Sequence, residues 1–519
     1  MTERPRHTHS DPSGLSRRDL LRLGASGAAA MALAAAPLPV LAQPLRGRAR
    51  PGATASRRSR LGRSTVLAHG DLHNHSQLSD AIGDPAVAHA AMRDAGLDIA
   101  ALTDHTVSAV ALPDVDVCSF VPIPPAGTEN PCTSVFGMDA EGFAATGRYA
   151  DAVDDPGRFT ALRGFEWSSP YLGHMNVWFS EQVTDPLATG GLTGEGLARI
   201  GLTEVALRAL LAPLAGIPGV EETIEAILAG EDEGMGPFYD WLARSPQALL
   251  GGGADAIASF NHPNREPEAF DAFAFDVRVR ERVVAMEIFN RREDYLFKNV
   301  AFGLPSPLVA CLDAGWRVGL SGVTDEHGDD WGEPEGKGRT GLYVDGLDRA
   351  AVFSAMRDRR FFATRETGLR LDAAANGATR MGQLVPGRSP QLQVELDLAW
   401  DAERTGMPLE VQVLTSGDQV PTVTQVEEIR LPAPDEQRPL RLTVSVNRRA
   451  TSWLVLRIAD PSEPNDAPGP SGHPCNNRAL AYTSPFYLAD ARPARSSGPR
   501  RPPTLPATDP EALFLGRHR

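Results

Sequence analysis

Two pairs of residues in this chain have the types and the spacing of metal ligands. His73 and His75 stand two residues apart in Asp71-Leu72-His73-Asn74-His75, and Asp325 and His327 repeat that spacing much later in the chain. Side chains at i and i+2 point to the same face of a β-strand, so each pair presents two ligands to one point. Imidazole nitrogens and carboxylate oxygens bind first-row divalent metals. The two pairs therefore predict a metal site.

Further candidate ligands lie at or near the ends of other apolar runs. These candidates are Asp80, His105, Glu166, His174 and His262. The other six histidines are scattered over tails, a loop, a helix and a strand entry (His7, His9, His69, His89, His473 and His518). A lone strand histidine is more often hydrogen-bonded than metal-bound, but nine ligand-type residues that recur at strand ends indicate one shared metal cluster.

The predicted elements that carry these residues alternate between strands and helices from Ser64 onward. The helix is expected over 84–95, and the strands over 65–73, 97–102, 159–166, 174–179, 256–262, 283–290 and 317–327. Because carboxyl ends of parallel strands meet on one face, this order predicts a βα-barrel with the ligands at that face. Residues 185–253 form a mostly helical insertion, either a lid or a structural element, and the structural reading is favoured.

The pattern changes after about Thr367. Residues 392–398, 409–414 and 440–446 largely alternate between apolar and polar, and 453–458 is a denser apolar run. This pattern predicts a small antiparallel β-sandwich over 371–490. Residues 461–477 are expected to form a long polar loop, and 491–519 a disordered tail.

The N-terminus has the features of an export signal. Ser16-Arg17-Arg18-Asp19-Leu20 precedes an Ala- and Leu-rich run that ends at Val40-Leu41-Ala42, which resembles a twin-arginine signal over 1–42 with its cleavage site. A basic linker over 43–63 would follow. The signal implies export to the periplasm or beyond with the twin-arginine machinery as partner, and no stable membrane span is expected. The alternative is a disordered basic arm.

Charge and cysteine content narrow the function classes. The net charge is −15 overall, and about −28 on residues 64–490 once the Arg-rich ends are set aside. Such an acidic body repels phosphate backbones, so a long nucleic acid is not expected as a substrate. The four cysteines form no CxxC. Cys118 and Cys132 either close a disulfide in an oxidising compartment or remain thiols.

The motifs, taken in order, resemble those of the PHP (polymerase and histidinol phosphatase) family of metal-dependent hydrolases. The matching segments are 71–76, 79–80, 96–98, 103–105, 164–166, 261–263 and 325–327. The resemblance implies a distorted (β/α)7 barrel over 64–370. It also implies two or three divalent ions (Mn, Fe or Zn) held by His73, His75, Asp80, His105, Glu166, His174, His262, Asp325 and His327. Residues 166–168, 173–176 and 286–290 look more like the CehA/McbA-like branch, which includes carbamate ester hydrolases.

The expected chemistry is attack by a metal-bridging hydroxide on phosphorus or a carbonyl carbon. Glu166 is the natural bridging carboxylate, and Asp325 or an unbound histidine such as His174 would act as general acid or base. Asp71 and Asp104 are expected to orient imidazoles, or else to cap turns. Arg265, Arg291 and Arg292 could meet an anionic substrate, although ordinary surface arginines are favoured.

The sequence thus predicts an exported metal-dependent hydrolase of a small phosphoester, ester or carbamate. The alternatives are a PHP-type nuclease or phosphodiesterase, and a non-catalytic metal-binding or carbohydrate-adhesion protein.

Overall fold

The computed structural model describes residues 57–62, 64–110, 128, 132–266, 268–332, 337–434, 436 and 438–488. The predicted signal over 1–42, the predicted tail over 491–519 and Cys118 lie outside the described residues.

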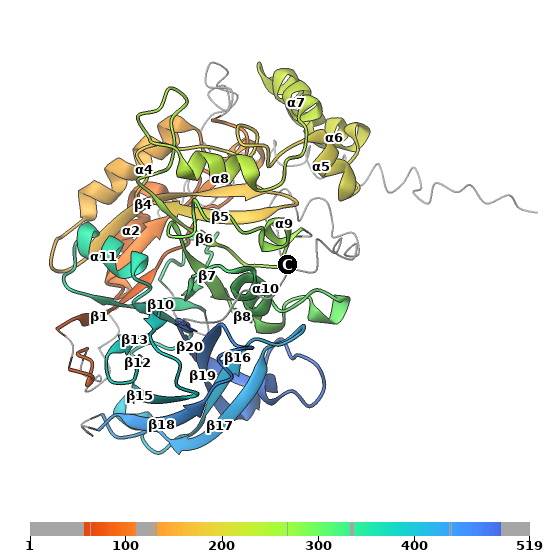
Figure 1. Ribbon diagram of the computed structural model, residues 1–519. Coiled ribbons are helices and arrows are strands. Elements are labelled where there is room, and N and C mark those ends of the chain that lie inside the picture. Colours follow the sequence, from red (N-terminus) through yellow and green to blue (C-terminus); the bar gives the residue numbers. More distant parts are fainter. Residues whose placement is uncertain are drawn as a thin grey trace, which may run out of the picture. The chain divides into compact units, whose positions relative to one another are not determined.

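The central sheet is mixed and mostly parallel (Figure 1). Its parallel pairs are β1 (Val66–Asp71) with β2 (Ile99–Leu102), β2 and the short β3 (His105–Thr106) with β4 (Thr160–Ser169), β6 (Ile257–Phe260) with β7 (Val283–Asn290), and β7 with β9 (Gly319–Val323). Antiparallel pairs interrupt this order: β5 (Gly173–Trp178) runs antiparallel to both β4 and β6, β8 (Glu293–Asp294) to β7, and β10 (Arg339–Val344) to β1. The predicted α/β class is confirmed in this form.

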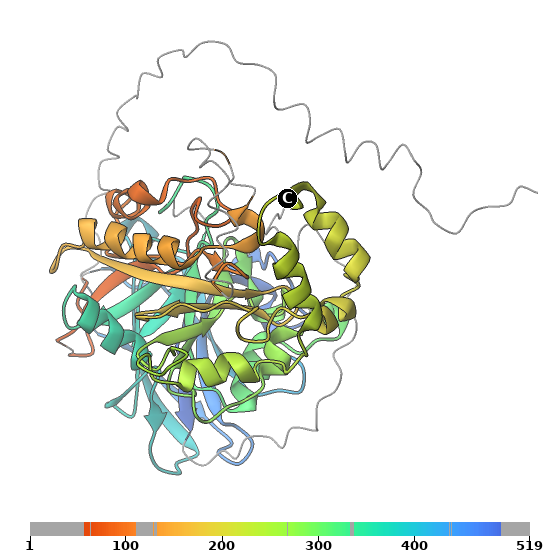
Figure 2. The ribbon, with the colours of Figure 1, turned by 90° about the horizontal axis from the view of Figure 1, so that it is seen from above.

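Helices cover the outer side of these strands (Figures 1 and 2). The covering helices are α2 (Pro85–Asp94), α4 (Ala140–Val153) and α11 (Arg349–Arg357). The connections between strands contain α3 (Thr133–Phe136), α9 (Ala269–Phe273), α10 (Pro307–Ala314) and the 3-10 turns η2 (Tyr295–Phe297) and η3 (Val300–Phe302). The strands are buried on both faces, which explains why they read as continuous apolar runs. α2 starts where predicted, since the Asp84 side chain accepts from the Ala86 N–H and Pro85 occupies the first turn.

The segments after β1 and β9 lie side by side. Asn74 and Glu326 form a parallel bridge, the Asp325 N–H donates to the His73 carbonyl (3.0 Å), and the His75 N–H donates to the Glu326 carbonyl (2.9 Å). The first and last ligand pairs of the sequence are therefore direct neighbours in space.

The helical insertion packs on the barrel. It contains α5 (Gly194–Arg199), α6 (Glu204–Leu211), η1 (Ala212–Leu214), α7 (Val220–Ala229) and α8 (Gly236–Ala243). Phe238 of α8 lies 4.7 Å from Trp167 of β4 between ring centroids, and Trp241 lies 5.9 Å from Phe165. These rings are buried, so the α8 end of the insertion belongs to the hydrophobic core.

The C-terminal strands form two antiparallel sheets around a shared apolar core. One sheet contains β12 (Arg370–Ala375), β13 (Thr379–Arg380), β15 (Gln391–Ala399) and β18 (Leu440–Ser445). The other sheet contains β16 (Pro408–Thr415), β17 (Thr422–Arg430), β19 (Trp453–Pro464), β20 (Asn477–Thr483) and β21 (Phe486–Leu488). The short strand β14 (Leu384–Val385) lies beside β21, and the 3-10 turn η4 (Ala402–Arg404) lies between strands. The second sheet is continuous with the barrel, because β20 pairs with β11 (Phe361–Thr364), β11 with β10 (Arg339–Val344), and β10 with β1.

Two sequence predictions for connecting segments need correction. The expected polar loop over 461–477 is shorter, because β19 continues to Pro464 and η5 (Pro474–Asn476) precedes β20. The last part of the expected linker also contacts the body: the Arg57 guanidinium lies 2.6 Å from the Asp98 carboxylate, and the Arg60 N–H donates to Asp397. Backbone and charge partners far along the chain hold this segment, and no local pattern reveals them.

Cys132 is disulfide-bonded, whereas Cys311 and Cys475 are free. Among the described residues no single helix is long and apolar enough to cross a membrane, while one sharply bent pair, Tyr295–Phe302 with Pro307–Ala314, passes the same test of length and composition.

Candidate metal centre

All nine side chains predicted from the sequence lie together at one edge of the central sheet. Most of the residues follow β1, β2, β6 and β9, and Glu166 lies in the second half of β4, where it pairs with His105 at the start of β3. His174 instead comes near the start of β5, and the antiparallel direction of β5 brings that start to the same edge. Eight of the nine are buried and His327 is partly exposed.

Glu166 lies at the centre of this cluster. Its Oε1 is 3.2 Å from Nε2 of His73 and of His262, and 3.4 Å from Nδ1 of His174. Its Oε2 is 2.6 Å from Nδ1 of His105 and 3.5 Å from Nε2 of His75. One carboxylate thus faces imidazoles from five positions on the sheet edge, which is the arrangement expected of a carboxylate shared between ions.

The ligand atoms divide into overlapping groups that could each hold one ion. In each group the donor atoms lie within 4.8 Å of one another: His75, Asp80, His105 and His327; His73, His75 and Glu166; His105, Glu166 and His174; and His174, His262 and Glu266. Asp325 joins the cluster through Oδ1, which is 3.2 Å from Nε2 of His75 and 3.4 Å from Nε2 of His73.

The cluster has the unmet polar groups that a bound cation would satisfy. Glu166 Oε2 and Asp80 Oδ1 are fully buried and have imidazole nitrogens as their neighbours, His105 Nδ1 at 2.6 Å and His327 Nε2 at 3.3 Å, without the geometry of a regular hydrogen bond. Nε2 of His73 faces Nε2 of His75 at 3.0 Å, although at most one of two neutral imidazoles can place a proton between them. Buried carboxylates need compensating cations, and nitrogen and oxygen donors without thiolates suit Mn, Fe or Zn.

Several residues that orient the ligands were not assigned a role from the sequence. Glu287 accepts from Nδ1 of His73 (2.8 Å) and from the backbone N–H of His262 (2.7 Å). Asn261 donates to Glu166 (2.7 Å), and Ser168 Oγ lies 2.6 Å from Nδ1 of His105. A carboxylate on the outer nitrogen of an imidazole fixes its orientation. The available signal was Glu287 itself, a charged residue inside the apolar strand β7.

Glu266 is a second residue that the sequence did not reveal. Its Oε2 lies 3.3 Å from Nδ1 of His262, on the side of the ring that faces away from Glu166. Its Oε1 accepts from Arg265 at 2.6 Å. Because Arg265 already neutralises this carboxylate, Glu266 is better suited to orient His262 than to hold an ion of its own.

The two aspartates expected to orient imidazoles bind other groups. Asp71 accepts from the backbone N–H and the hydroxyl of Thr324, which ties β1 to the end of β9. Asp104 accepts from the N–H of Ser76 (2.7 Å) and the hydroxyl of Ser79 (2.8 Å). The expectation of imidazole contacts is wrong for both, and Asp104 fits the capping alternative.

Electrostatics inside the cluster favour the protonation state of a metal ligand at some residues and oppose it at others. Burial alone lowers the pKa of His105, but Asp80 and Glu166 outweigh it and raise that pKa to about 9, and Glu166 and Glu287 likewise raise the pKa of His73. A bound ion would displace the protons of these two rings. Burial alone raises the pKa of Glu166, but His73, His105 and His174 outweigh it and hold the pKa well below its ordinary value. Burial lowers the pKa of His174 to about 4, although Glu166 and Glu266 raise it. Glu166 is therefore an anion and His174 a neutral imidazole near neutral pH.

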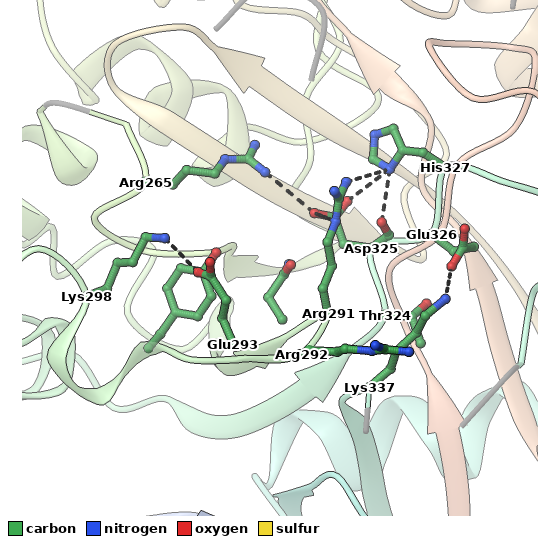
Figure 3. A pocket seen from close by; sticks show the side chains of 12 residues that line it. Arg265, Arg291, Arg292, Glu293, Lys298, Thr324, Asp325, Glu326, His327 and Lys337 are labelled. Carbon is green, nitrogen blue, oxygen red and sulfur yellow. Dashed lines mark hydrogen bonds and ion pairs between the residues drawn. The ribbon is translucent and has the colours of Figure 1, made fainter. Parts of the chain in front are cut away.

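A cavity of about 440 Å³ opens beside the cluster, and five cationic and three acidic side chains line it (Figure 3). Arg265 and Arg291 both reach Oδ2 of Asp325 at 3.5 Å. Lys298 pairs with Glu293 and Lys337 with Glu326, while Arg292 lines the wall without an ion-pair partner among the described residues. The preference for ordinary surface arginines is wrong for Arg265, whose side chain is 14% exposed because it packs against Glu266 and His174. Arg292 is exposed and still lines the cavity.

Three residues at this edge adopt left-handed backbone conformations. His262 (φ 25°), Arg291 (φ 51°) and Asp325 (φ 50°) follow β6, β7 and β9 respectively. Such conformations cost a non-glycine residue about 1 kcal/mol or more, and they concentrate at functional sites. The sharp turn at each strand end places these side chains at the cluster and the cavity.

Comparisons with known proteins give distant structural similarity. No protein-family model and no curated protein matches the chain. The chain is similar to a two-domain protein from Bacteroides vulgatus containing a predicted PHP-like metal-dependent phosphoesterase (13% identity, TM-score 0.35), with 85% of this chain and 100% of that one covered.

Two further structures are similar over about half of the chain. One is a protein named as a metal-dependent phosphoesterase from Bifidobacterium adolescentis (12% identity, TM-score 0.28, 55% and 95% covered). The other is an amidohydrolase from Chromobacterium violaceum with bound sulfate and no metal (19% identity, TM-score 0.23, 50% and 88% covered). The first structure bears the family name that the sequence motifs resemble.

Proposed function

We propose that this protein is a metal-dependent hydrolase of the PHP type that cleaves a small phosphoester. The observation that carries the proposal is the contact between the cationic cavity and the ligand cluster. Asp325 faces His73 and His75 with Oδ1 and faces Arg265 and Arg291 with Oδ2. A substrate held by the arginines would therefore have its reacting bond beside the ligand cluster.

The residues that would hold the ions are the nine predicted ones. When bound, divalent ions at such sites lower the pKa of water and stabilise negative charge on the oxygens of the transition state. The guanidinium groups of Arg265 and Arg291 can bind phosphoryl oxygens with the fork geometry that lysine lacks. Asp325 Oδ2 borders the cavity beside the arginines and can accept a proton from attacking water. Glu287 keeps His73 in place, and Asn261 keeps Glu166 in place.

The cavity favours a phosphoester over the other predicted substrates. The wall keeps an excess of positive charge, because Glu293, Asp325 and Glu326 do not balance its five cationic side chains. A neutral carbamate or carboxyl ester offers no full charge to Arg265, Arg291 and Arg292, the three arginines of this wall. The volume of about 440 Å³ also suits a small molecule. A nuclease would need a surface that follows a polyanionic strand, which the acidic body disfavours.

A substrate panel tests the proposal. The purified protein would be stripped with a chelator, reloaded separately with Mn, Fe or Zn, and assayed with aryl phosphomonoesters, phosphodiesters, carboxyl esters and carbamates. We expect two or three bound ions per chain and chelator-sensitive cleavage of phosphoesters above all. Preferential cleavage of the carbamate would support the CehA/McbA-like reading instead, and absence of bound metal would overturn the proposal.

We also propose that the protein is exported by the twin-arginine pathway to the periplasm or beyond. The support is the signal-like segment at 1–42 together with the disulfide at Cys132, a bond that persists in oxidising compartments. Replacing Arg17 and Arg18 by lysine should leave the full-length precursor in the cytoplasmic fraction. Unchanged export of that variant would contradict the proposal.

A further inference from the structure

The cationic wall of the cavity is built on one tight turn. Arg291 and Arg292 connect β7 to the two-residue strand β8 (Glu293–Asp294). The two strands are antiparallel, and Phe289 pairs with Asp294 and Asn290 with Glu293. Arg291 adopts the left-handed conformation that favours glycine. A turn with this cost keeps its shape only if the surrounding structure holds it.

The barrel holds one side of the turn. The Arg291 N–H donates to the Val323 carbonyl (3.1 Å), and the Gly338 N–H donates to the Arg291 carbonyl (2.9 Å). Residue 338 must be glycine for this approach, because a Cβ there would lie 2.5 Å from the Val323 nitrogen. These contacts fix the turn at Arg291 but leave β8 to be held from elsewhere.

The C-terminal sheet holds the other side through Asp294. This carboxylate is 1% exposed and caps its own chain by accepting from the Leu296 N–H (3.0 Å). The Tyr482 hydroxyl of β20 donates to Asp294 Oδ2 (2.9 Å), and the Asn465 amide after β19 donates to the same atom (3.2 Å). The neighbours of Asp294 in sequence, Glu293 and Tyr295, both line the cavity.

Arg457 completes this arrangement from β19. Its Nε donates to the Tyr482 hydroxyl (2.9 Å), and its Nη2 lies 3.8 Å from Asp294 Oδ2. Nη1 donates to the side chains of Gln412 (2.8 Å) and Asn477 (2.6 Å). Arg457, Tyr482 and Asp294 are all buried, so the arginine fixes the hydroxyl and balances the carboxylate away from water.

We propose that Asp294, Tyr482 and Arg457 form a positioning device through which the C-terminal sheet holds the substrate-binding turn at Arg291 and Arg292. Without the Tyr482 hydroxyl, β8 would be held less firmly and the arginines would spend less time in the geometry that binds an anion. The kinetic part of this inference rests on the proposed function, whereas the structural part does not.

A matched pair of variants tests the device in the full-length, metal-loaded protein. Tyr482→Phe removes the hydroxyl that donates to Asp294. Tyr487→Phe removes an equally buried hydroxyl of β21 that donates to the Val318 carbonyl (2.6 Å), just before β9 and away from the cavity. Both changes keep the ring and remove a hydroxyl that donates from the C-terminal sheet to the barrel. Tyr482→Phe also leaves Arg457 Nε without its acceptor, so urea unfolding of both variants is measured beside the two readouts.

Two readouts separate positioning from stability. We expect Tyr482→Phe to raise KM for an aryl phosphomonoester about three- to tenfold with kcat changed less than about twofold. We also expect faster amide hydrogen exchange in residues 290–297 of Tyr482→Phe at unchanged metal content. Tyr487→Phe should leave both KM and exchange in 290–297 at the wild-type values.

Equal behaviour of the two variants in exchange over 290–297 would overturn the inference. So would a fall in kcat at unchanged KM. If the wild-type protein cleaves no phosphoester, the proposed function fails, and the exchange comparison still decides whether Tyr482 holds the turn.

Discussion

Two buried charged regions lie on either side of the Arg291 turn, and they differ in how completely their polar atoms are paired. Around Glu166, buried carboxylate oxygens and imidazole nitrogens face one another, and Glu166 Oε2 and Asp80 Oδ1 contact imidazoles without the geometry of a regular hydrogen bond. Around Arg457, the guanidinium nitrogens, the Tyr482 hydroxyl and both Asp294 oxygens have partners. The first region could hold added cations, and the second is complete as folded.

Under the proposed function, the difference separates the reactive site from a structural network. A satisfied buried network rigidifies the fold, whereas an unsatisfied one persists when a ligand or a reaction uses it. The comparison can be tested by removing one charge from each region.

The largest expected effect is on catalysis. Glu166→Gln should lower kcat at least about a hundredfold, because an amide cannot supply two anionic oxygens to the ions. Phosphoesterase assays and metal analysis by mass spectrometry measure the loss. Glu395→Gln is the control, since Glu395 pairs with the exposed Arg441 on the C-terminal sheet. Full activity in Glu166→Gln would show that this carboxylate is not part of the reaction.

The second effect is on stability. Arg457→Leu should lower the free energy of unfolding by about 3–5 kcal/mol, because Asp294 remains as a buried charge without its cation. Urea unfolding monitored by tryptophan fluorescence measures the change, and metal content of the folded variant should equal that of the wild type. Metal loss at unchanged stability would reverse the roles assigned to the two regions.

The third prediction concerns the pH dependence of stability that one unpaired buried group, His69, produces. Burial, helped by Arg339 and Arg57, lowers the pKa of His69 to about 3. Its folded pKa lies below the unfolded value of about 6.5, so its contribution is present above that value and is lost as pH falls toward 3. Between pH 7 and 5 His69 alone should cost about 2 kcal/mol of stability.

His69→Leu tests this pH dependence. His69 is buried in β1, and neither ring nitrogen has a hydrogen-bond partner among the described residues. Urea unfolding of the variant at the two pH values should show a smaller difference than the wild type shows. An identical difference in both proteins would mean that other groups control the acid response.

The smallest effect concerns the turn between the two regions. Arg292 is exposed at the cavity wall, so Arg292→Gln should raise KM for a phosphomonoester only about two- to threefold. The change should shrink at high salt, because exposed charges are screened. A salt-independent rise in KM would indicate direct, desolvated contact with the substrate.

The sequence determined the chemistry of the first region well. His73 with His75, and Asp325 with His327, are local patterns that identified ligands by residue type. Both pairs follow their strands, because β1 ends at Asp71 and β9 at Val323, and Asp325 is left-handed. The backbone bridge between Asn74 and Glu326, rather than a shared strand face, brings the pairs together. The strand at 283–290 has the predicted bounds, and the other barrel strands agree to within a few residues apart from 317–327, which shortens to Gly319–Val323. The alternation after Thr367 likewise predicted the strands at 391–399 and 408–415.

Only the tertiary structure decided which groups support that chemistry. His73 meets Glu287 across 214 residues of chain, and Asp294 meets Tyr482 across 188. Such partners depend on how the sheet closes and on strand register, which no local spacing encodes. The antiparallel direction of β5 and the burial of Arg265 have the same origin. Ligand types and face periodicity are local properties of a strand, whereas partners, burial and strand direction arise when distant segments pack.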